Sequence, residues 1–279
     1  MQISEIFYSI QGEGSRRGRP CTFVRLSGCP LRCRWCDTTY AFSGGETMSV
    51  AEILERVKSY STRMVCVTGG EPLAQHEVHG LMQDLADAGY TVLLETSGAF
   101  DLGGIDPRVV RIVDLKAPGS GEGARNLWSN LDLLRESDEL KFVLLDRRDY
   151  EWAREILERH ELASKVHALL FSPVHGELDP TLLAAWILKD GWRENLVRVA
   201  RPGRQPVWTR GEPGTIYTNL IEVIDPAKGT VLARTERGDP FVVGFLNDSL
   251  VHGGTHTRGG APQVVVTKVS FNPNGEKGR

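Results

Sequence analysis

The sequence predicts an α/β protein, an open, partial (β/α)6-type barrel with a C-terminal β-rich tail. Short apolar runs alternate with stretches of helical periodicity over residues 1–190, which is typical of parallel βαβ units. Roughly six such strands are too few for a closed eight-stranded barrel. After residue 194 the helical periodicity disappears, and Pro, Gly, Thr and Val become more frequent. We therefore expect one domain over residues 1–200 and a separate β-rich tail over residues 201–279.

The elements follow in order along the chain. Strands are predicted at residues 5–10, 21–27, 64–68, 91–95, 109–115, 140–145 and 166–171. A capping box of Ser49 and Glu52 begins the first helix. Further helices are predicted at residues 73–88, 127–134, 150–160 and 182–188. In the tail, residues 221–233 predict a hairpin around a Pro/Gly turn, and residues 241–246 and 263–269 predict strands.

Composition restricts the classes of function. The 279 residues are 41% hydrophobic and 25% charged, with a formal net charge of -3, so nothing indicates a basic nucleic-acid-binding surface. No apolar run approaches the roughly 18 residues of a membrane span. The first residues lack the basic and apolar regions of a signal peptide. We therefore expect a cytoplasmic protein without direct nucleic-acid or membrane partners.

Three cysteines, Cys29, Cys33 and Cys36, lie in one short loop at C-x3-C-x2-C spacing. Thiolates suit zinc or iron–sulfur clusters, and a cubane cluster takes one cysteine per iron, so three cysteines leave one iron open. Structural zinc is usually closed by a fourth Cys or His, and the loop contains no His. A disulfide with one spare thiol is the other alternative. Cys21 and Cys66 have apolar neighbours and are expected to be buried thiols.

Polar motifs follow four of the predicted strands, at the ends where α/β sheets gather ligand-binding groups. They are TGGEP at residues 68–72, ETSG at 95–98, DLK at 114–116 and SPVH at 172–175. Four strand ends that carry polar groups to one rim predict a convergent site.

Five motifs in this order resemble the 7-carboxy-7-deazaguanine synthases, a family of radical S-adenosylmethionine (SAM) enzymes. They are QGEG at residues 11–14, FVRL at 23–26, the cysteine loop with Asp37 and Thr38, TGGEP and DLK. The cysteine loop marks the superfamily, whereas the QGEG start and the Cys-Asp-Thr ending narrow the resemblance to this family. The resemblance covers residues 1–191 and implies a radical SAM barrel with a 4Fe-4S cluster, whose fourth iron chelates SAM.

The resemblance also implies a reaction. One-electron cleavage of SAM yields a 5′-deoxyadenosyl radical that takes hydrogen from 6-carboxy-5,6,7,8-tetrahydropterin. The ring then contracts and ammonia leaves, which gives 7-carboxy-7-deazaguanine for queuosine or another deazapurine. The resemblance further implies Mg²⁺, a flavodoxin-type electron donor and a homodimer. Exposed edge strands also favour a homodimer. The alternatives are a non-catalytic cluster-binding protein that uses its tail for partner binding, and another radical SAM enzyme.

By the same resemblance, single residues receive roles. Glu95 is the candidate proton-transfer group, and Thr38 is the candidate oxygen ligand of Mg²⁺. Gly69 and Gly70 lack a Cβ, so backbone there can approach the methionine part of SAM. The expected substrate-binding residues are Ile10, Gln11, Gly12, Glu13, Arg25 and Thr68, of which Arg25 can bind a carboxylate bidentately. The expected SAM-binding residues are Trp35, Asp37, Gly70, Glu71, Asp114, Leu115, Lys116, Ser172, Pro173, Val174 and His175.

Each of these roles has a structural alternative. The alternatives are an ordinary turn at Gly69 and Gly70, a surface pair of Asp114 and Lys116, a loop cap at Thr38, a surface arginine on an edge strand at Arg25 and a structural Glu95.

The chain departs from the family after residue 191. Family members commonly end with a strand similar to QLQLHK, which supplies a His that closes over the substrate, whereas residues 195–202 are NLVRVARP. Three explanations are open: a fused module, a shifted reading frame or joined gene fragments, and a degenerate last strand at residues 197–199. The abrupt change in composition favours the first two.

Overall fold

The computed structural model describes residues 1–190 and 192, together with the backbone of residues 196–199, 223–225, 230–233, 241–246, 249–256 and 263–269. The chain divides into two compact units, Met1–Ala200 and Arg201–Arg279. No helix among the described residues is long and apolar enough to cross a membrane.

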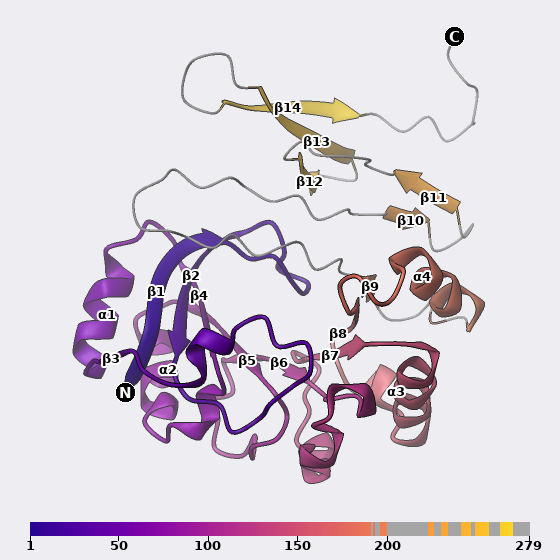
Figure 1. Cartoon of the computed structure of the whole chain (residues 1–279). Helices are drawn as coiled ribbons and strands as arrows, with labels where there is room; N and C mark the ends of the chain where they lie inside the picture. Colours follow the sequence, from indigo (N-terminus) through magenta and orange to yellow (C-terminus); the bar gives the residue numbers. More distant parts are fainter. Residues whose placement is uncertain are drawn as a thin grey trace. The chain divides into compact units, whose positions relative to one another are not determined.

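A nine-stranded sheet, ordered β3-β1-β2-β4-β5-β6-β7-β8-β9, forms the centre of the first unit (Figure 1). The strands are β1 Gln2–Ile10, β2 Pro20–Leu26, β3 Glu46–Thr47, β4 Met64–Gly69, β5 Thr91–Thr96, β6 Val110–Asp114, β7 Glu139–Leu144, β8 Ala168–Pro173 and β9 Leu196–Val199. β1 is antiparallel to β2 and β3, whereas all neighbours from β2 to β9 are parallel. The sheet is open because β3 and β9 stand at its two edges. The predicted α/β class is confirmed.

Four α-helices connect parallel strands: α1 Val50–Lys58, α2 Val78–Asp87, α3 Arg147–Arg159 and α4 Pro180–Lys189. The predicted capping box is confirmed, since the Ser49 side chain accepts from the Glu52 N–H and the Glu52 carboxylate accepts from the Ser49 N–H. The helix predicted at residues 73–88 is instead a 3₁₀ turn, η2 Pro72–Ala74, followed by α2. The prediction joined these two elements because both carry apolar residues at helical spacing.

The helix predicted at residues 127–134 is wrong. A 3₁₀ segment, η5 Trp128–Asp132, stands there. Its buried Asn130 donates to the carbonyls of Gly98 and Phe100 and accepts from the Leu102 N–H. An Asn that bonds remote backbone in this way competes with regular helix, so the segment makes a short turn.

The sheet carries two separate hydrophobic clusters. The larger cluster combines outward-facing strand residues, such as Val67 and Leu94, with the apolar faces of α1 to α4. The smaller one lies on the inner face and includes Cys21 and Cys66, both of which are 0% exposed, as predicted. Because side chains alternate along a strand, residues two positions beyond this inner cluster face the same way. The carboxyl ends of the strands therefore form a polar rim above an apolar floor.

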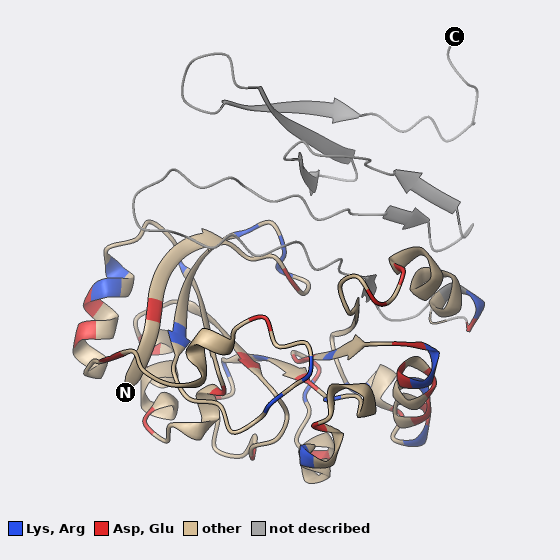
Figure 2. Cartoon of the chain, in the orientation of Figure 1, with Lys and Arg blue, Asp and Glu red and all other residues tan. Residues whose placement is uncertain are grey.

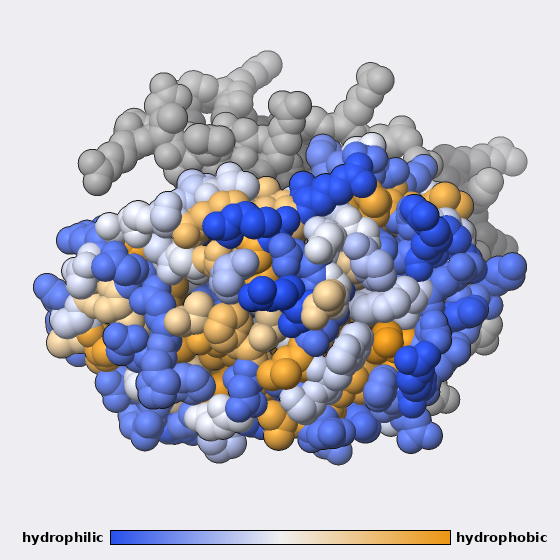
Figure 3. Space-filling model, turned by 60° about the horizontal axis from the view of Figure 1, so that its bottom comes forward, coloured by the Kyte–Doolittle hydropathy of each residue, from blue (hydrophilic) through white to orange (hydrophobic). Residues whose placement is uncertain are grey.

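The rim gathers Arg25, Thr68, Glu95, Asp114, Lys141 and Ser172 from six different strands. Elsewhere on the first unit charges are mixed, and α1 and α3 each carry both signs (Figure 2). On the face that Figure 3 shows, polar residues surround smaller apolar areas. The rim thus brings four ionisable side chains, those of Arg25, Glu95, Asp114 and Lys141, to one end of the sheet.

The last strand of the sheet resolves one of the open explanations. β9 pairs in parallel with β8, with Leu169 opposite Val197 and Phe171 opposite Val199, so residues 197–199 do form a last strand. In the second unit, the predicted hairpin is confirmed as β10 Val223–Asp225 and β11 Thr230–Ala233, and the two predicted strands as β12 Phe241–Leu246 and β14 Gln263–Val269. β13 Ser249–His256 was not predicted because its glycines interrupt the apolar pattern.

Candidate active site

Strand register brings the rim residues side by side. Glu5 on β1 lies opposite Arg25 on β2, and Arg25 lies opposite Thr68 on β4. Further along the sheet, Asp114 on β6 lies opposite Lys141 on β7. Neighbouring strands are roughly 4.8 Å apart, so these side chains can interact directly.

The Glu95 carboxylate accepts hydrogen bonds from two other predicted site residues. Thr68 Oγ1 donates to its Oε2 at 2.9 Å, and Gln11 Nε2 donates to its Oε1 at 3.4 Å. Below them, burial and the neighbouring Glu95 raise the pKa of the Cys66 thiol. Gln11 is only 3% exposed, although it belongs to the connection between β1 and β2. The structure therefore brings the predicted proton-transfer group together with two predicted substrate residues.

Asp114 and Lys116 form a half-buried pair rather than a surface pair. Lys116 Nζ lies 2.9 Å from Asp114 Oδ2, and the side chains are 17% and 18% exposed. Burial lowers the pKa of Lys116, but the negative charges of Asp114 and Cys33 outweigh this effect and raise it. The second oxygen, Asp114 Oδ1, is buried without a hydrogen-bond partner. An orphaned acceptor of this kind needs an explanation, and a bound ligand with a hydroxyl group supplies one.

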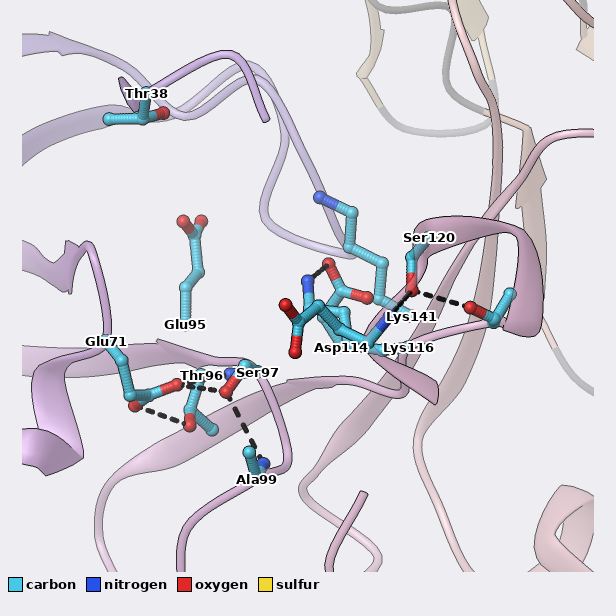
Figure 4. Close-up of polar contacts among 12 residues, drawn as sticks. Thr38, Glu71, Glu95, Thr96, Ser97, Ala99, Asp114, Lys116, Ser120 and Lys141 are labelled. Atoms are coloured by element: carbon cyan, nitrogen blue, oxygen red, sulfur yellow. Dashed lines mark hydrogen bonds and ion pairs between the residues drawn. The ribbon is translucent and has the colours of Figure 1, made fainter. Parts of the chain in front are cut away.

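The rim also contains Lys141, a residue that the motifs did not indicate. Figure 4 shows Lys141 and Glu95 extending from the sheet to the same side. Lys141 forms an ion pair with Glu13. Burial lowers the pKa of Lys141, but Glu13, Asp114 and Glu95 together outweigh this effect and raise it. A lysine inside the otherwise apolar run at residues 140–145 was the available signal.

The cysteine loop is fixed beside this rim by backbone hydrogen bonds. Gly28 N–H donates to Ala41 O at 2.8 Å, and Arg34 N–H donates to Ser120 O at 2.9 Å. All three loop cysteines are free and partly exposed, so the disulfide alternative is not supported. Burial raises the pKa of Cys29 and of Cys33, and the charge of Lys116 acts in the opposite direction at both. The loop thus lies within electrostatic reach of the β6 end.

The cysteine loop offers three thiolates as donors. A structural zinc is usually closed by a fourth Cys or His, and the loop contains no His. In a cubane cluster each cysteine binds a different iron. Cys29, Cys33 and Cys36 are therefore the residues that would hold a 4Fe-4S cluster.

The Gly-Gly-Glu segment after β4 supports the loop. A Cβ at Gly70 would lie 2.3 Å from Gly28 O and 2.9 Å from Cys29 Cβ, so the close approach at Gly70 is to the cysteine loop itself. Glu71 is 0% exposed, and its carboxylate accepts hydrogen bonds from Leu73, Thr96 and Ser97. Leu115 is 1% exposed and belongs to the outer cluster. Glu71 and Leu115 can therefore offer SAM only backbone groups.

Arg25 and Thr38 differ from their structural alternatives. Arg25 is 8% exposed on an interior strand, and its Nε donates to Glu5 Oε1 at 2.7 Å. Thr38 is the N-cap residue of the 3₁₀ turn η1 Thr39–Phe42, but its hydroxyl makes no capping hydrogen bond and donates instead to Asp37 Oδ1 at 2.7 Å. Arg25 is therefore not a surface arginine, and the Thr38 hydroxyl does not cap the turn.

The remaining predicted residues are spread around the rim. Ser172, Pro173 and Val174 are buried at the end of β8, whereas His175 and Ile10 are exposed. Trp35 and Gly12 are half-buried. Their roles toward SAM or substrate stay predictions.

A three-cysteine loop beside a partial barrel with a polar rim defines a radical SAM enzyme, and residues 23–113 match the family model of the radical SAM superfamily. A 7-carboxy-7-deazaguanine synthase from Koribacter versatilis is 45% identical over 223 residues, which cover 75% of this chain and 97% of that protein. A 7-carboxy-7-deazaguanine synthase from Chlorobaculum tepidum is 47% identical over 193 residues, which cover 68% of this chain and 87% of that protein. The crystal structure of QueE from Escherichia coli matches with a TM-score of 0.60 and 25% identity, covering 72% of this chain and 93% of that one. The chain belongs to the 7-carboxy-7-deazaguanine synthase family.

Proposed function

We propose that this protein is a carbon–nitrogen lyase that converts 6-carboxy-5,6,7,8-tetrahydropterin to 7-carboxy-7-deazaguanine. Loss of one ammonia balances substrate and product. The observation that carries the proposal is the junction of Gln11, Thr68 and Glu95 on the rim beside the cysteine loop. Two donors hold the Glu95 carboxylate at a strand end, where it can accept a proton from the substrate or return one.

Arg25 is suited to bind the substrate carboxylate. Its Nε is bound to Glu5, and the described residues give its two terminal nitrogens no hydrogen bond. Because Glu5 also accepts from the Tyr40 hydroxyl at 2.8 Å, the arginine is held in one orientation. A fixed guanidinium with free terminal N–H groups matches a planar carboxylate.

The cofactors follow from the donor set and the family. When bound and reduced, the cluster held by Cys29, Cys33 and Cys36 supplies the electron for SAM cleavage. Asp114 Oδ1 offers an acceptor to the ribose hydroxyls of SAM, and Lys116 offers a cation to its carboxylate. Thr38 offers one hydroxyl oxygen to Mg²⁺, which keeps most of its waters. A flavodoxin-type donor, a homodimer and a cytoplasmic location belong to the same proposal.

The test is anaerobic reconstitution of the full chain with iron and sulfide, followed by reduction with SAM, the pterin and Mg²⁺. Mass spectrometry would measure 5′-deoxyadenosine and 7-carboxy-7-deazaguanine. Product formation by the wild type and a loss of about a hundredfold or more in Glu95→Gln support the proposal. An intact cluster that forms 5′-deoxyadenosine without product would reject the proposed substrate. Glu77→Gln is the matched control, because Glu77 is exposed at the start of α2 and its side chain makes no capping hydrogen bond.

A further inference from the structure

The connection between β1 and β2, residues 11–19, folds back onto the inner face of the sheet. Gln11 contacts Glu95 on β5, and Glu13 forms an ion pair with Lys141 on β7. The Ser15 N–H donates to Glu139, also on β7, at 3.1 Å. A connection of this length would usually run over the surface, so three attachments to two strands are an unusual restraint.

Glu139 and Lys141 are two positions apart on β7, so both side chains face the connection. Glu139 is 1% exposed and accepts hydrogen bonds from the Ser15 N–H, the Ser15 hydroxyl and Arg16 Nη1. A Cβ on Gly14 would lie 2.5 Å from Glu139 Oε2, and Gly14 has a φ of +70°. Glu139 therefore anchors Ser15 and Arg16, in the second part of the connection, through buried contacts.

Lys141 restrains the part of the connection that carries the QGEG motif. Its side chain is 16% exposed, and that of Glu13 is 41% exposed. Glu13, Glu95 and Asp114 all lie near enough to act on Lys141 electrostatically. Asp114 has a second cation in Lys116, whereas the described contacts give Glu13 no other cation than Lys141. Glu95 and Asp114 repel Glu13, so loss of Lys141 would remove the cation that holds Glu13 at β7.

We propose that Lys141 is a positioning residue for the pterin substrate: by holding Glu13 against β7, it keeps residues 11–14 in the conformation that receives the pterin. This inference rests on the proposed function. The SAM side of the rim depends on the separate pair of Asp114 and Lys116. Loss of the lysine charge should therefore weaken pterin binding while SAM binding is largely retained.

The test compares Lys141→Met and Lys141→Arg with the wild type in the reconstituted full chain. A charge-assisted contact of this kind corresponds to about tenfold to a hundredfold in affinity, and we expect this increase in the pterin KM of Lys141→Met. Its KM for SAM should stay within about threefold, because Asp114 keeps its own cation. Lys141→Arg should restore most of the pterin affinity, since the charge is retained. Lys58→Met is the control, because Lys58 pairs with Glu55 on the exposed face of α1.

Hydrogen exchange provides a readout that does not depend on turnover. Amides of residues 11–14 should exchange faster in Lys141→Met, while those of residues 15–19, anchored by Glu139, change less. Unchanged exchange and unchanged pterin KM would overturn the proposal, as would an equal loss of affinity for SAM and pterin. If Lys141→Met does not fold, hydrogen exchange at residues 11–14 of Glu13→Gln tests the restraint instead, because that substitution removes the charge that Lys141 holds. If the wild type forms no product, the proposed function fails, whereas the exchange result still decides whether Lys141 restrains the connection.

Discussion

Replacement of Glu71 by Gln should destabilise the protein, although it only exchanges one carboxylate oxygen for an NH₂ group and removes one charge. Glu71 is 0% exposed. Its Oε1 accepts from the Leu73 N–H at 3.0 Å and from Thr96 Oγ1 at 2.9 Å. Its Oε2 accepts from the Ser97 N–H at 2.7 Å and from the Ser97 hydroxyl. Each carboxylate oxygen therefore accepts one backbone N–H and one hydroxyl.

A Gln side chain cannot satisfy this arrangement in either orientation. A hydroxyl can rotate and accept from the new NH₂ group, but a backbone N–H cannot. One buried N–H, on Leu73 or on Ser97, will thus face another donor. A hydrogen bond to a charged group contributes about 1.5–3 kcal/mol, and an unsatisfied buried donor adds to the loss. We therefore expect the free energy of unfolding to fall by about 2–4 kcal/mol.

Urea unfolding of the cluster-free protein, followed by far-UV circular dichroism, measures this difference directly. The control is Glu77→Gln, which should change stability by less than about 0.5 kcal/mol. A loss below about 1 kcal/mol for Glu71→Gln would refute the reasoning, because a buried N–H would then have found another acceptor. A normal stability combined with weakened SAM binding would show instead that the Glu71 side chain serves the ligand.

Two further predictions concern the cysteine loop and the apolar floor. Gly70→Ala places its Cβ against Gly28 O and should lower the iron bound after reconstitution, measured by the cluster absorbance, whereas Gly80→Ala in α2 meets open space and should bind iron normally. Burial raises the pKa of Cys21 from 9.0 to about 12. The stability that this thiol contributes is complete below the unfolded pKa and is lost as the pH rises toward the folded value. Between pH 9 and 12, stability of the cluster-free wild type should fall more steeply than that of Cys21→Ala, by about 1.4 kcal/mol per pH unit, in urea titrations. Equal slopes would show that the Cys21 thiol is not shielded.

Most strands could be predicted from the sequence because local patterns determine them. The apolar runs that became β4, β5 and β8 are buried on both faces, which produces a continuous hydrophobic signal. The helix start at Ser49 was predictable because both partners of a capping box lie within one turn. The segment at residues 127–134 was not, because the bonds of Asn130 reach backbone about thirty positions away.

For the candidate site, the sequence by itself determined which chemistry is available. The spacing of three cysteines identifies the candidate cluster ligands, since all of them lie within one loop. Only the tertiary structure decided what the surrounding charges do. It buries the Glu71 carboxylate, leaves Asp114 Oδ1 without a hydrogen-bond partner and pairs Glu13 with Lys141. Strand order and register set these contacts between residues far apart in the chain, and no local pattern records which strands become neighbours.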